Sequence, residues 1–436
     1  MRRRGPERAV RAAITRGAME AQFTDLKFWD AEAMQSEWLR VTDVCHGCRR
    51  CFNLCPSFSI LFNGIDALDG EVERLGAAVT RDVVDACYYC KLCYNHCPYT
   101  PPHEFRLDFP LLMVREKAVR AKTERPRLRD RLLVKTDLIG QTARWVAPLL
   151  NRLLRAGWFR TLLQRVGGIH KDRRLPPIAS ETFPTWFRKQ YLRRDGERKV
   201  ALFAGCLTNY NYPSIGRATV QVLEKNGVAT AWPEQRCCGM PYFDTGDIAA
   251  ATEHARRNVA SLKAMVDQGY AVVSPIPTCS LMLKKEYPAL LNTDDSRLVA
   301  KNTFDICEYL VNLHKKGQLS TDFSGRVGTV VYQAACHLRD QNIGYKARDL
   351  LQLIPGTTVE VIERCSGHDG SWSVKAEFFG ASMQVGQKAF RAVNAAEAQT
   401  LTSDCPLSGL QLEQATGKTS CHPIELLNRA YGLPET

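Results

Sequence analysis

The residues best suited to chemistry in this sequence are eight cysteines within its first hundred positions. They form two runs with the same spacing, C-x-x-C-x-x-C-x-x-x-C-P, which begin at Cys45 and Cys87. Three thiolates at i, i+3 and i+6 come from one tight loop that can wrap an iron–sulfur cluster, and the fourth thiolate of that run cannot reach back to it. This spacing is typical of bacterial proteins with two [4Fe–4S] clusters, in which the fourth cysteine of each run binds the other cluster.

The crossed arrangement predicts the ligands of each cluster. The two sets are Cys45, Cys48, Cys51 and Cys97 for one cluster, and Cys87, Cys90, Cys93 and Cys55 for the other. Zinc is the alternative metal, since C-x-x-C pairs also bind Zn²⁺, but zinc sites usually take two pairs and each run here is a quartet closed by proline. We therefore expect two [4Fe–4S] clusters, with His46 and His96 facing solvent from the loops rather than binding iron.

A second cysteine pattern lies in the C-terminal half, at Cys206, Cys237, Cys238 and Cys279. The outer two each end an apolar stretch typical of a strand, and the ends of parallel strands share one edge of a sheet, where binding sites form. The adjacent pair cannot chelate one ion comfortably but can bind different irons of a cluster, and Gly239 lets the backbone turn close to it. The pattern predicts a third iron–sulfur cluster, with a buried structural cysteine pair as the alternative.

The same pattern recurs later in the chain, which indicates an internal duplication. Cys206, Cys237 and Cys279 are answered by Cys336, Cys365 and Cys405, at offsets of 130, 128 and 126 residues. The surrounding sequence matches as well: AGC corresponds to AAC, and RCCGMPYFD corresponds to RCSGHDGSW. A repeat of such a long period predicts two similar units that stack or face one another.

The elements that must position these cysteines are of two kinds. The cysteine-dense head begins with a helical pattern, FTDLKFWDAEAMQSEWLR, that either Asp30 or Thr24 is suited to cap. The C-terminal half contains apolar strand patterns at 199–206, 271–279 and 328–336, and helical patterns lie between them. Strands that alternate with helices imply a parallel sheet with helix cover.

Between the head and the C-terminal half lies a segment without cysteine that holds most of the positive charge. Residues 114–200 carry 23 Lys and Arg against 8 Asp and Glu, within a chain whose formal net charge is +13. Its pattern predicts an amphipathic helical hairpin or broken helix, interrupted near Pro148 and Gly157. We expect residues 131–166 to dock on anionic lipid or on a partner protein; the alternative is a helix packed on its own protein with a solvated basic side.

Length and composition limit the class of protein and the number of domains. A chain of 436 residues with 45% apolar and 24% charged residues suggests about three folded domains and excludes wholesale disorder. No uncharged apolar run approaches the ~20 residues that span a bilayer. The 17 cysteines are odd in number and no signal-peptide core is visible, so metal chemistry in a reducing compartment, the cytoplasm, is favoured over a disulfide framework.

Together these patterns predict a multidomain α+β chain. An α-helical two-cluster ferredoxin domain is followed by a duplicated pair of α/β cysteine-rich domains. The expected boundaries are 1–26 for a basic N-terminal tail, 27–112 for the ferredoxin domain, 113–197 for a basic amphipathic helical connector, 198–325 for the first cysteine-rich repeat and 326–436 for the second, degenerate repeat. We expect the Arg-rich tail to lack structure.

The head and the duplicated Cys…CCG…Cys pattern resemble the CCG-domain iron–sulfur proteins, a family related to heterodisulfide reductase. The likeness includes GCLTNYNYPSIG, CCGMP, TCSLMLKKEYP, ACH and the terminal CHPIELL. The family includes the iron–sulfur subunits of glycolate oxidase and of anaerobic glycerol-3-phosphate dehydrogenase. The resemblance implies two [4Fe–4S] clusters in a helical ferredoxin domain, a further cluster in the CCG repeats, and electron transfer from a flavoprotein dehydrogenase towards membrane quinone.

Both copies depart from the family repeat, which is Cys…CCG…CxxC. In the first copy Met282 stands where the last cysteine is expected, and four thiolates remain. In the second copy Ser366 and Ser408 replace two cysteines. The thiolates left in that copy are Cys336, Cys365 and Cys405.

Three thiolates are one fewer than a stable four-iron cluster needs, so we expect the second repeat to hold no cluster. The alternative is an open-site cluster on those three thiolates. Its fourth ligand would come from His337, His368, Ser366 or Cys421. Cys307 aligns with none of the ligand positions, and we expect it in the core.

The leading hypothesis is a non-catalytic electron-transfer subunit of an oxidoreductase complex. No GxGxxG loop follows a strand at a suitable place, so the chain needs a partner flavoprotein dehydrogenase, of glycerol-3-phosphate or 2-hydroxy-acid type. Electrons would pass to quinone or another acceptor, with the chain in the cytoplasm or peripheral on the inner face of the cytoplasmic membrane. A disulfide reductase that uses a CCG cluster is the alternative, and the lost CxxC cysteines argue against it. A nucleic-acid binder would leave the clusters unexplained.

Overall fold

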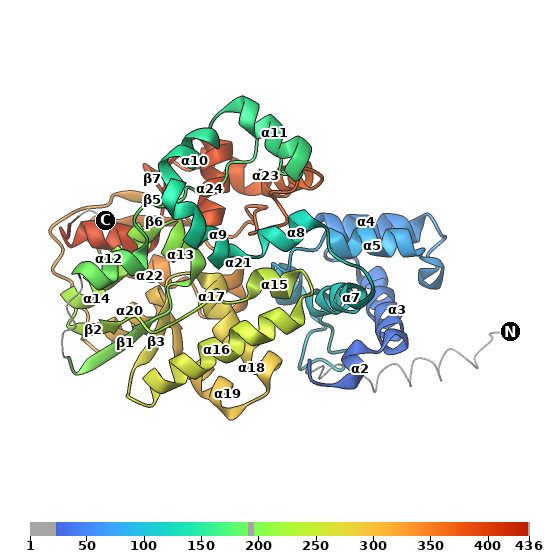
Figure 1. Ribbon diagram of the computed structural model, residues 1–436, viewed down its shortest axis with the longest axis horizontal. Helices are drawn as coiled ribbons and strands as arrows, with labels where there is room; N and C mark the ends of the chain where they lie inside the picture. The colour runs from blue at the N-terminus through green and yellow to red at the C-terminus, as the bar shows by residue number, and fades with distance from the viewer. Residues whose placement is uncertain (1–22, 191–195, 435–436) are drawn as a thin grey trace. The chain divides into compact units, whose positions relative to one another are not determined.

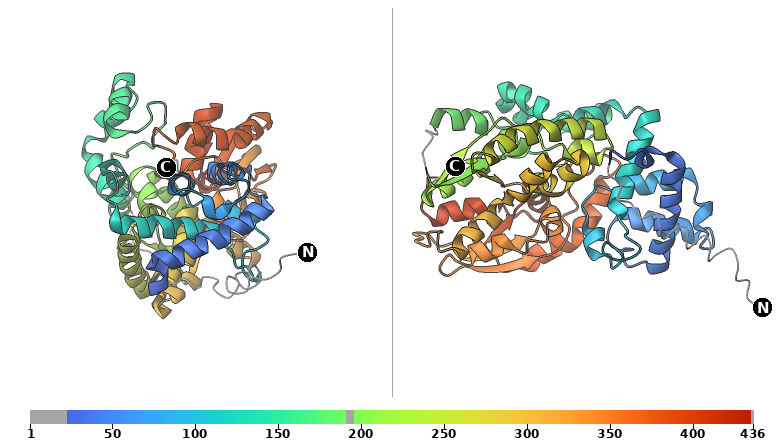
Figure 2. Two further views of the ribbon diagram at one scale, coloured as in Figure 1. Left: turned by 90° about the vertical axis from the view of Figure 1, so that its right-hand side faces the viewer. Right: turned by 90° about the horizontal axis from the view of Figure 1, so that it is seen from below.

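The computed structural model describes residues 23–190 and 196–434, so most of the expected basic tail lies outside the described residues. The chain divides into two compact units (Figure 1, Figure 2). The first unit consists of the chain up to Arg125 together with Phe243–Ile248, and the second consists of Pro126–Tyr242 and Ala249–Thr436. The cysteine-dense head and the first residues of the connector therefore belong to one unit. The connector from Pro126 onward and most of both cysteine-rich repeats belong to the other.

The first unit is helical. Its elements are α2 (Leu26–Trp29), α3 (Ala31–Cys48), α4 (Pro56–Asp66), the 3-10 turn η1 (Val72–Arg74), α5 (Ala77–Asp85), α6 (Leu92–His96) and α7 (Phe109–Thr123). Asp30 caps α3 as the sequence suggests, because its carboxylate accepts the N–H of Ala33 at 2.7 Å. The unit has a core of its own, in which Trp38, Phe58 and Leu112 are fully buried.

The connector is a series of short helices in the second unit rather than one hairpin. Its elements are α8 (Leu128–Leu133), α9 (Thr136–Ala143), the 3-10 turn η2 (Arg144–Val146), α10 (Ala147–Leu153), α11 (Gly157–Gly167) and α12 (Phe183–Gln190). Two breaks fall where the sequence predicts them, since Pro148 lies in the first turn of α10 and Gly157 opens α11. Gly168 ends α11 with a φ of 63°, which favours glycine.

The first cysteine-rich repeat is built on a parallel four-stranded sheet of order β2-β1-β3-β4. Its strands are β1 (Arg198–Leu202), β2 (Val228–Ala231), β3 (Ala271–Ser274) and β4 (Thr303–Asp305). Its helices are α13 (Gly205–Tyr210), α14 (Pro213–Lys225), α15 (Met240–Asp244), α16 (Ile248–Val266), α17 (Pro277–Leu281), the π-helical turn η3 (Met282–Glu286), α18 (Tyr287–Leu291), α19 (Asp294–Lys301) and α20 (Ile306–Lys315). Val200 of the central strand β1 pairs with Thr230 on one side and Ala271 on the other.

The second repeat has a parallel sheet of order β6-β5-β7-β8, which is the same arrangement one repeat later. Its strands are β5 (Thr329–Gln333), β6 (Thr358–Ile362), β7 (Thr400–Ser403) and β8 (Ser420–Cys421). Its helices are α21 (Cys336–Asp340), α22 (Lys346–Leu351), α23 (Phe379–Ala395), α24 (Pro406–Thr416) and α25 (Pro423–Ala430). The matching strand order is the fold that an internal duplication predicts.

The two repeats share one hydrophobic core. Helix α14 of the first repeat packs against α25 of the second, and Leu223 and Leu427 from these helices are both fully buried. At the same contact, the Asn428 side chain donates to Gln221 Oε1 at 2.6 Å. The repeats are therefore held face to face by packing, and Cys307 lies in this core as expected.

The strands end earlier than the sequence patterns suggest. We expected Cys206, Cys279 and Cys336 to be the last residues of strands, but β1, β3 and β5 end at Leu202, Ser274 and Gln333. The cysteines instead lie in the short helices that follow. These positions still cluster at the carboxyl edge of each parallel sheet, which is where such folds place binding sites.

Candidate iron–sulfur sites

The structure brings head cysteines together in the first of the two crossed sets. Burial, and then the neighbouring Cys51, Cys97 and Cys48, raise the pKa of the Cys45 thiol. Burial, and then Cys97 and Cys48, likewise raise the pKa of Cys51 to about 12. These four thiols therefore occupy one small volume, although Cys97 belongs to the other run.

The second crossed set forms in the same way. Burial raises the pKa of Cys93 well above its usual value, and Cys90, Cys55 and Cys87 raise it further. Crowded, buried thiolates repel one another, and bound iron would relieve that repulsion because a coordinating metal deprotonates thiols outright. Each donor set has four soft ligands, so the residues fit two [4Fe–4S] clusters.

The two cysteine runs share one backbone feature, although Cys45 and Cys48 lie in α3 and Cys87 and Cys90 lie between helices. Arg49 directly follows Cys48, Lys91 directly follows Cys90, and both have left-handed backbone at φ of 50° and 58°. The N–H of Arg49 donates to the carbonyl oxygen of Cys45 at 2.8 Å and ends α3 there. A left-handed residue after the second cysteine of each run reverses the chain around the site, a strain that the surrounding structure must hold in place.

The histidines inside the loops are engaged with charged side chains. His46 Nε2 lies 3.7 Å from Asp66 Oδ1. His96 is exposed, and its Nε2 accepts a hydrogen bond from Arg50 Nε at 3.2 Å. These partners suit loop surfaces rather than iron ligands.

Lys117 of α7 is a residue of the head site that the sequence does not single out. Its Nζ donates to the carbonyl oxygen of Cys87 at 2.7 Å and lies 3.3 Å from Asp244 Oδ1. Burial disfavours the charged amine, but Asp244 and then Cys87 outweigh burial and raise its pKa. The result is a buried cation next to the second set of thiols, within the first unit.

The first CCG site gathers four thiols from three segments that follow strands. Cys206 lies in α13 and Cys279 in α17, while Cys237 and Cys238 precede α15. The Sγ atoms of Cys206 and Cys237 are 3.9 Å apart. Exposure is only 1% for Cys237, 3% for Cys238 and 4% for Cys279, so this site is closed on most sides.

Gly205 makes room for the first CCG site. It has a φ of 69°, and a Cβ built there would lie 2.7 Å from the Sγ of Cys279. No side chain fits at that distance, so only glycine allows Cys279 to approach the segment that carries Cys206. The four thiols and this close approach fit an iron–sulfur cluster.

Side chains from three elements hold the backbone of the CC pair. Asp137 Oδ2, on α9 of the connector, accepts the N–H of Cys237 at 2.6 Å. The ring of His254 lies with Nδ1 2.9 Å from the carbonyl oxygen of Cys237, and Tyr287 Oη donates to that of Cys238 at 2.9 Å. Burial and then Cys237 raise the pKa of Asp137 to about 6. The sequence gives no sign that the connector contributes to this site.

The remaining position of the first repeat is apolar. Met282, which replaces the last family cysteine, is fully buried and opens the π-helical turn η3. Among the described residues no three Cys, His, Asp or Glu side chains converge closely enough to hold one metal ion.

The second CCG site keeps three thiols and replaces the lost ones with a hydrogen bond. Burial raises the pKa of Cys336, and Cys365 and Cys405 raise it further, so the three thiols are neighbours. Ser366 Oγ and Ser408 Oγ, which stand where the family has cysteines, lie 2.9 Å apart and are both buried. The two hydroxyls therefore satisfy each other.

Three of the four candidate completing ligands are engaged elsewhere. His337 Nδ1 lies 2.8 Å from Thr278 Oγ1, Ser366 pairs with Ser408, and the Cys421 thiol lies 3.6 Å from the carbonyl oxygen of Leu401. His368 differs, because it is 6% exposed and neither ring nitrogen has a hydrogen-bond partner among the described residues. Burial, and then Arg173, lower its pKa to about 3.

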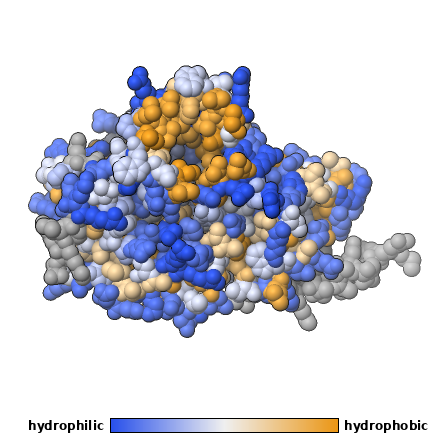
Figure 3. Space-filling view, viewed as in Figure 1, coloured by the Kyte–Doolittle hydropathy of each residue, from blue (hydrophilic) through white to orange (hydrophobic). Residues whose placement is uncertain are grey.

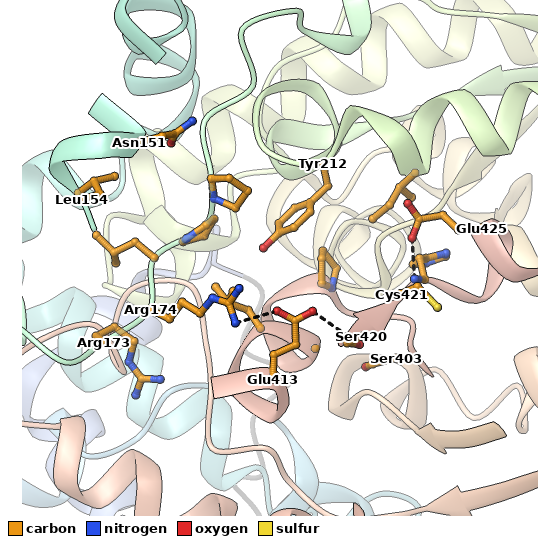
Figure 4. Close-up of a pocket in the computed structure, with 18 of the residues that line it drawn as sticks. Asn151, Leu154, Arg173, Arg174, Tyr212, Ser403, Glu413, Ser420, Cys421 and Glu425 are labelled. Atoms are coloured by element: carbon orange, nitrogen blue, oxygen red, sulfur yellow. Dashed lines mark hydrogen bonds and ion pairs between the residues drawn. The ribbon is translucent and has the colours of Figure 1, made fainter. Parts of the chain in front are cut away.

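A cavity of about 290 Å³ opens between the connector and both repeats (Figure 4). Some of its charged groups are engaged: Arg174 lies 3.1 Å from Glu413, and Glu425 accepts the backbone N–H of His422 at 2.8 Å. Arg155 also lines the cavity and has no ion-pair partner in the described part of the chain. The hydroxyl of Tyr212 is the polar group there without a hydrogen-bond partner among the described residues.

The chain matches two family models. The model of the 4Fe-4S dicluster domain matches residues 37–98. The model of the cysteine-rich CCG domain matches twice, at 200–284 and 330–413. The matched segments contain both cysteine runs and both repeats of the predicted pattern.

Two curated relatives align with large parts of this chain. The chain is 30% identical over 313 residues to the C subunit of anaerobic glycerol-3-phosphate dehydrogenase from Escherichia coli (strain K12), which covers 71% of this chain and 78% of that protein. It is 31% identical over 188 residues to lactate utilization protein A of Geobacillus kaustophilus (strain HTA426), which covers 41% of this chain and 75% of that protein. None of the helices in the described ranges is long and apolar enough to span a bilayer.

Proposed function

The chain belongs to the CCG-domain iron–sulfur family, and from this membership and its three groups of thiols we propose that it is an electron-transfer subunit of a dehydrogenase complex. It would take electrons from a partner flavoprotein dehydrogenase of glycerol-3-phosphate or 2-hydroxy-acid type and pass them to quinone or another acceptor. When bound, iron–sulfur clusters supply one-electron redox steps at potentials that the surroundings set. The residues of this chain would hold the clusters and exclude water from them.

Closure of the first CCG site is the observation that carries this proposal. An electron relay needs buried ligands, whereas a centre that attacks a substrate sulfur needs an open approach. Cys237, Cys238 and Cys279 are each at most 4% exposed. The hydrogen bonds from Asp137, His254 and Tyr287 also hold this loop in one conformation, which suits electron transfer without rearrangement.

In the head, Lys117 would tune the second cluster. Its ammonium group is held by the Cys87 carbonyl and by Asp244, so the cation stays in place when an electron arrives. Charge and hydrogen bonds close to a cluster set its potential. The aromatic Phe58 and Tyr89, both 2% exposed, would keep water away from the same region.

The proposal is tested by isolating the tagged chain from cells without oxygen and identifying the flavoprotein that co-purifies. Adding the substrate of that flavoprotein should bleach the cluster absorbance of this chain within the complex. The matched control is the Cys90→Ala variant, which should bleach less because one cluster is lost. Absence of a flavoprotein partner, or clusters that stay oxidised in its presence, would defeat the proposal.

A disulfide reductase is the second candidate function, and the ring of His368 is the observation in its favour. The three neighbouring thiols would need a fourth ligand to hold an open-site cluster, and the buried His368 ring, which has no hydrogen-bond partner in the described residues, is the candidate for it. The discriminating measurement mixes the reduced protein with small-molecule and protein disulfides. Rapid reoxidation of the clusters with release of thiols would favour the reductase over the relay.

A further inference from the structure

The connector helices present a concentrated apolar surface. Of the twelve large apolar side chains that are exposed among the described residues, ten lie in 128–166. They are Leu128, Leu132, Leu138, Ile139, Trp145, Val146, Leu149, Trp158, Leu162 and Val166. Figure 3 shows apolar side chains gathered over α10 and α11 at the top of the view. We call these ten residues the apolar face, and a patch of this kind marks an interaction site.

The helices that carry the apolar face are firmly packed, because their opposite side contacts the rest of the second unit. Gly140 of α9 packs against the ring of Tyr210, where a Cβ would lie 2.3 Å from the ring. Ala147 of α10 is fully buried. Arg160 of α11 is 6% exposed and donates to the carbonyl oxygens of His170 and Lys171. The helices are thus fixed to the second unit with their apolar side outward.

The exposed charge around the apolar face is positive, because the two acidic residues within 128–166, Asp130 and Asp137, are not exposed. Residues 138–166 contain five Arg and no Lys, Asp or Glu. Arg152, Arg155 and Arg165 are exposed and have no ion-pair partner in the described part of the chain. Arg144 stacks on Trp145, with its guanidinium carbon 4.5 Å from the ring centroid.

We propose that the apolar face seats this protein on an anionic membrane surface, with Trp145 and Trp158 at the headgroup level. Tryptophan prefers that interface, and arginine stems extend from apolar surface to place their charge among lipid phosphates. Helices this short lie in the interface plane rather than crossing the bilayer. A protein partner of mixed charge would leave exposed acids on this surface as well, and residues 138–166 have none. This inference rests on the proposed function, because it names the surface of the protein at which an electron acceptor in the membrane would be met.

Helix α9 contributes both to the first CCG site and to the apolar face. Thr136 and Asp137 belong to the helix that holds the first CCG site, and the adjacent Leu138 and Ile139 are 54% and 43% exposed on the apolar face. The lipid surface and the first CCG site would then be separated by roughly one helix diameter, about 10 Å. A lipid-soluble acceptor would reach the protein at the site where we expect the third cluster.

The test is flotation of the full-length, anaerobically purified protein with vesicles. Vesicles of phosphatidylcholine alone are compared with vesicles made of equal parts phosphatidylcholine and phosphatidylglycerol. One variant replaces Trp145, Trp158 and Val166 with Ser, and a second replaces Arg152, Arg155 and Arg165 with Gln. The matched control replaces three exposed cations elsewhere, Arg256, Lys388 and Arg391, with Gln.

We expect the parent protein to float with the anionic vesicles at low salt and to be released by high salt. The apolar variant should lose binding, the Arg variant should bind roughly a hundredfold more weakly, and the control should bind like the parent. No flotation of the parent, or equal loss in the control, would overturn the proposal. Unchanged vesicle binding together with loss of the flavoprotein from the apolar variant would show a protein interface instead. Because flotation requires no electron transfer, its outcome is independent of the relay test.

Discussion

Thr278 Oγ1 and His337 Nδ1 lie 2.8 Å apart, and this contact joins the two cysteine-rich repeats at their sites. Thr278 precedes Cys279 of the first CCG site, and His337 follows Cys336 of the second. On the same helices, Gln341 donates to Ser280 Oγ at 2.8 Å. The second repeat therefore supports α17, which carries a predicted ligand of the first site, and this gives a degenerate repeat a structural role.

Replacing His337 with Ala should weaken the first site. Thr278 would lose its partner at a half-buried contact. Leaving a fully buried polar group unsatisfied costs about 1–3 kcal/mol, and a half-buried group should fall at the lower end of that range. We expect a lower free energy of unfolding in denaturant and faster loss of iron from the first CCG site on exposure to a chelator. His314→Ala is the control, since it lies far along the chain from either site, at the end of α20. If the two variants have the same unfolding free energy and lose iron at the same rate, His337 does not support the first CCG site.

The two head clusters are predicted to depend on separate cysteine sets. Replacing Cys48 or Cys90 with Ala should each remove the spectroscopic signal of one cluster and leave that of the other. The change should also destabilise the head, because metal binding supplies folding free energy in small metal-bound domains. Electron paramagnetic resonance of the reduced protein measures this directly. A full signal from both clusters in either variant would refute the crossed assignment.

Gly205→Ala should abolish the cluster of the first CCG site. A methyl group there would lie 2.7 Å from the Sγ of Cys279, on a backbone with a φ of 69°. We expect the loss of about four irons, because a four-iron cluster is lost as a whole. The matched control is Ala335→Gly, which changes the corresponding position of the second repeat and should leave the iron content unaltered. A full iron content in Gly205→Ala would show that the site can relax around the methyl group.

Covalent spacing explains what the sequence could predict, and long-range contacts explain what it could not. The crossing of Cys97 follows from how far a short loop can reach, and the structure places it beside Cys45 as predicted. Asp137 and Lys117 carry no motif, and their partners Cys237 and Asp244 are 100 and 127 residues away. Their roles depend on tertiary packing. The sequence alone shows that Ser366 and Ser408 replace two ligands. Their hydrogen bond to each other could be seen only in the structure, because 42 residues separate them.

A buried pair of carboxyls should make stability fall as pH rises. Burial, and then Asp404, raise the pKa of Asp305 to about 8, and burial raises the pKa of Asp404 to about 7. The two titrate as a pair, whereas in the unfolded chain each ionises near pH 4, about the usual carboxyl value. The folded state binds more protons in between, so their contribution to stability is complete below about pH 4 and is lost as pH rises to about 8.

Asp305→Asn should therefore flatten the fall in unfolding free energy between mildly acidic and mildly alkaline pH. The amide keeps the oxygen that accepts the N–H of Cys307 at 2.9 Å, so the cap of α20 survives. Urea unfolding at several pH values measures the slope. Asp294→Asn is the control, because its side chain is 99% exposed and should leave the slope unchanged. A parent protein whose stability rises across this range would contradict the raised pKa values of Asp305 and Asp404.

The iron content separates the two repeats. The first CCG site has four thiols, whereas the second has three and a serine pair that is already satisfied. Protein purified without oxygen should hold about 12 irons, from two head clusters and one CCG cluster of four irons each. Cys237→Ala should lower this to about 8, and Cys365→Ala should leave it unchanged, because only the first site is expected to be filled.

Two other iron counts would each change the assignment of clusters to the two CCG sites. About 16 irons in the parent protein, falling in Cys365→Ala, would mean that the second site is filled. His368 would then be the fourth ligand, because it is the candidate whose ring nitrogens have no hydrogen-bond partner in the described residues, and His368→Ala should remove the extra four irons, about one cluster. About 8 irons under strict exclusion of oxygen would make both repeats structural. Electrons would then leave from the head, and the apolar face would no longer lie beside the last centre of the relay.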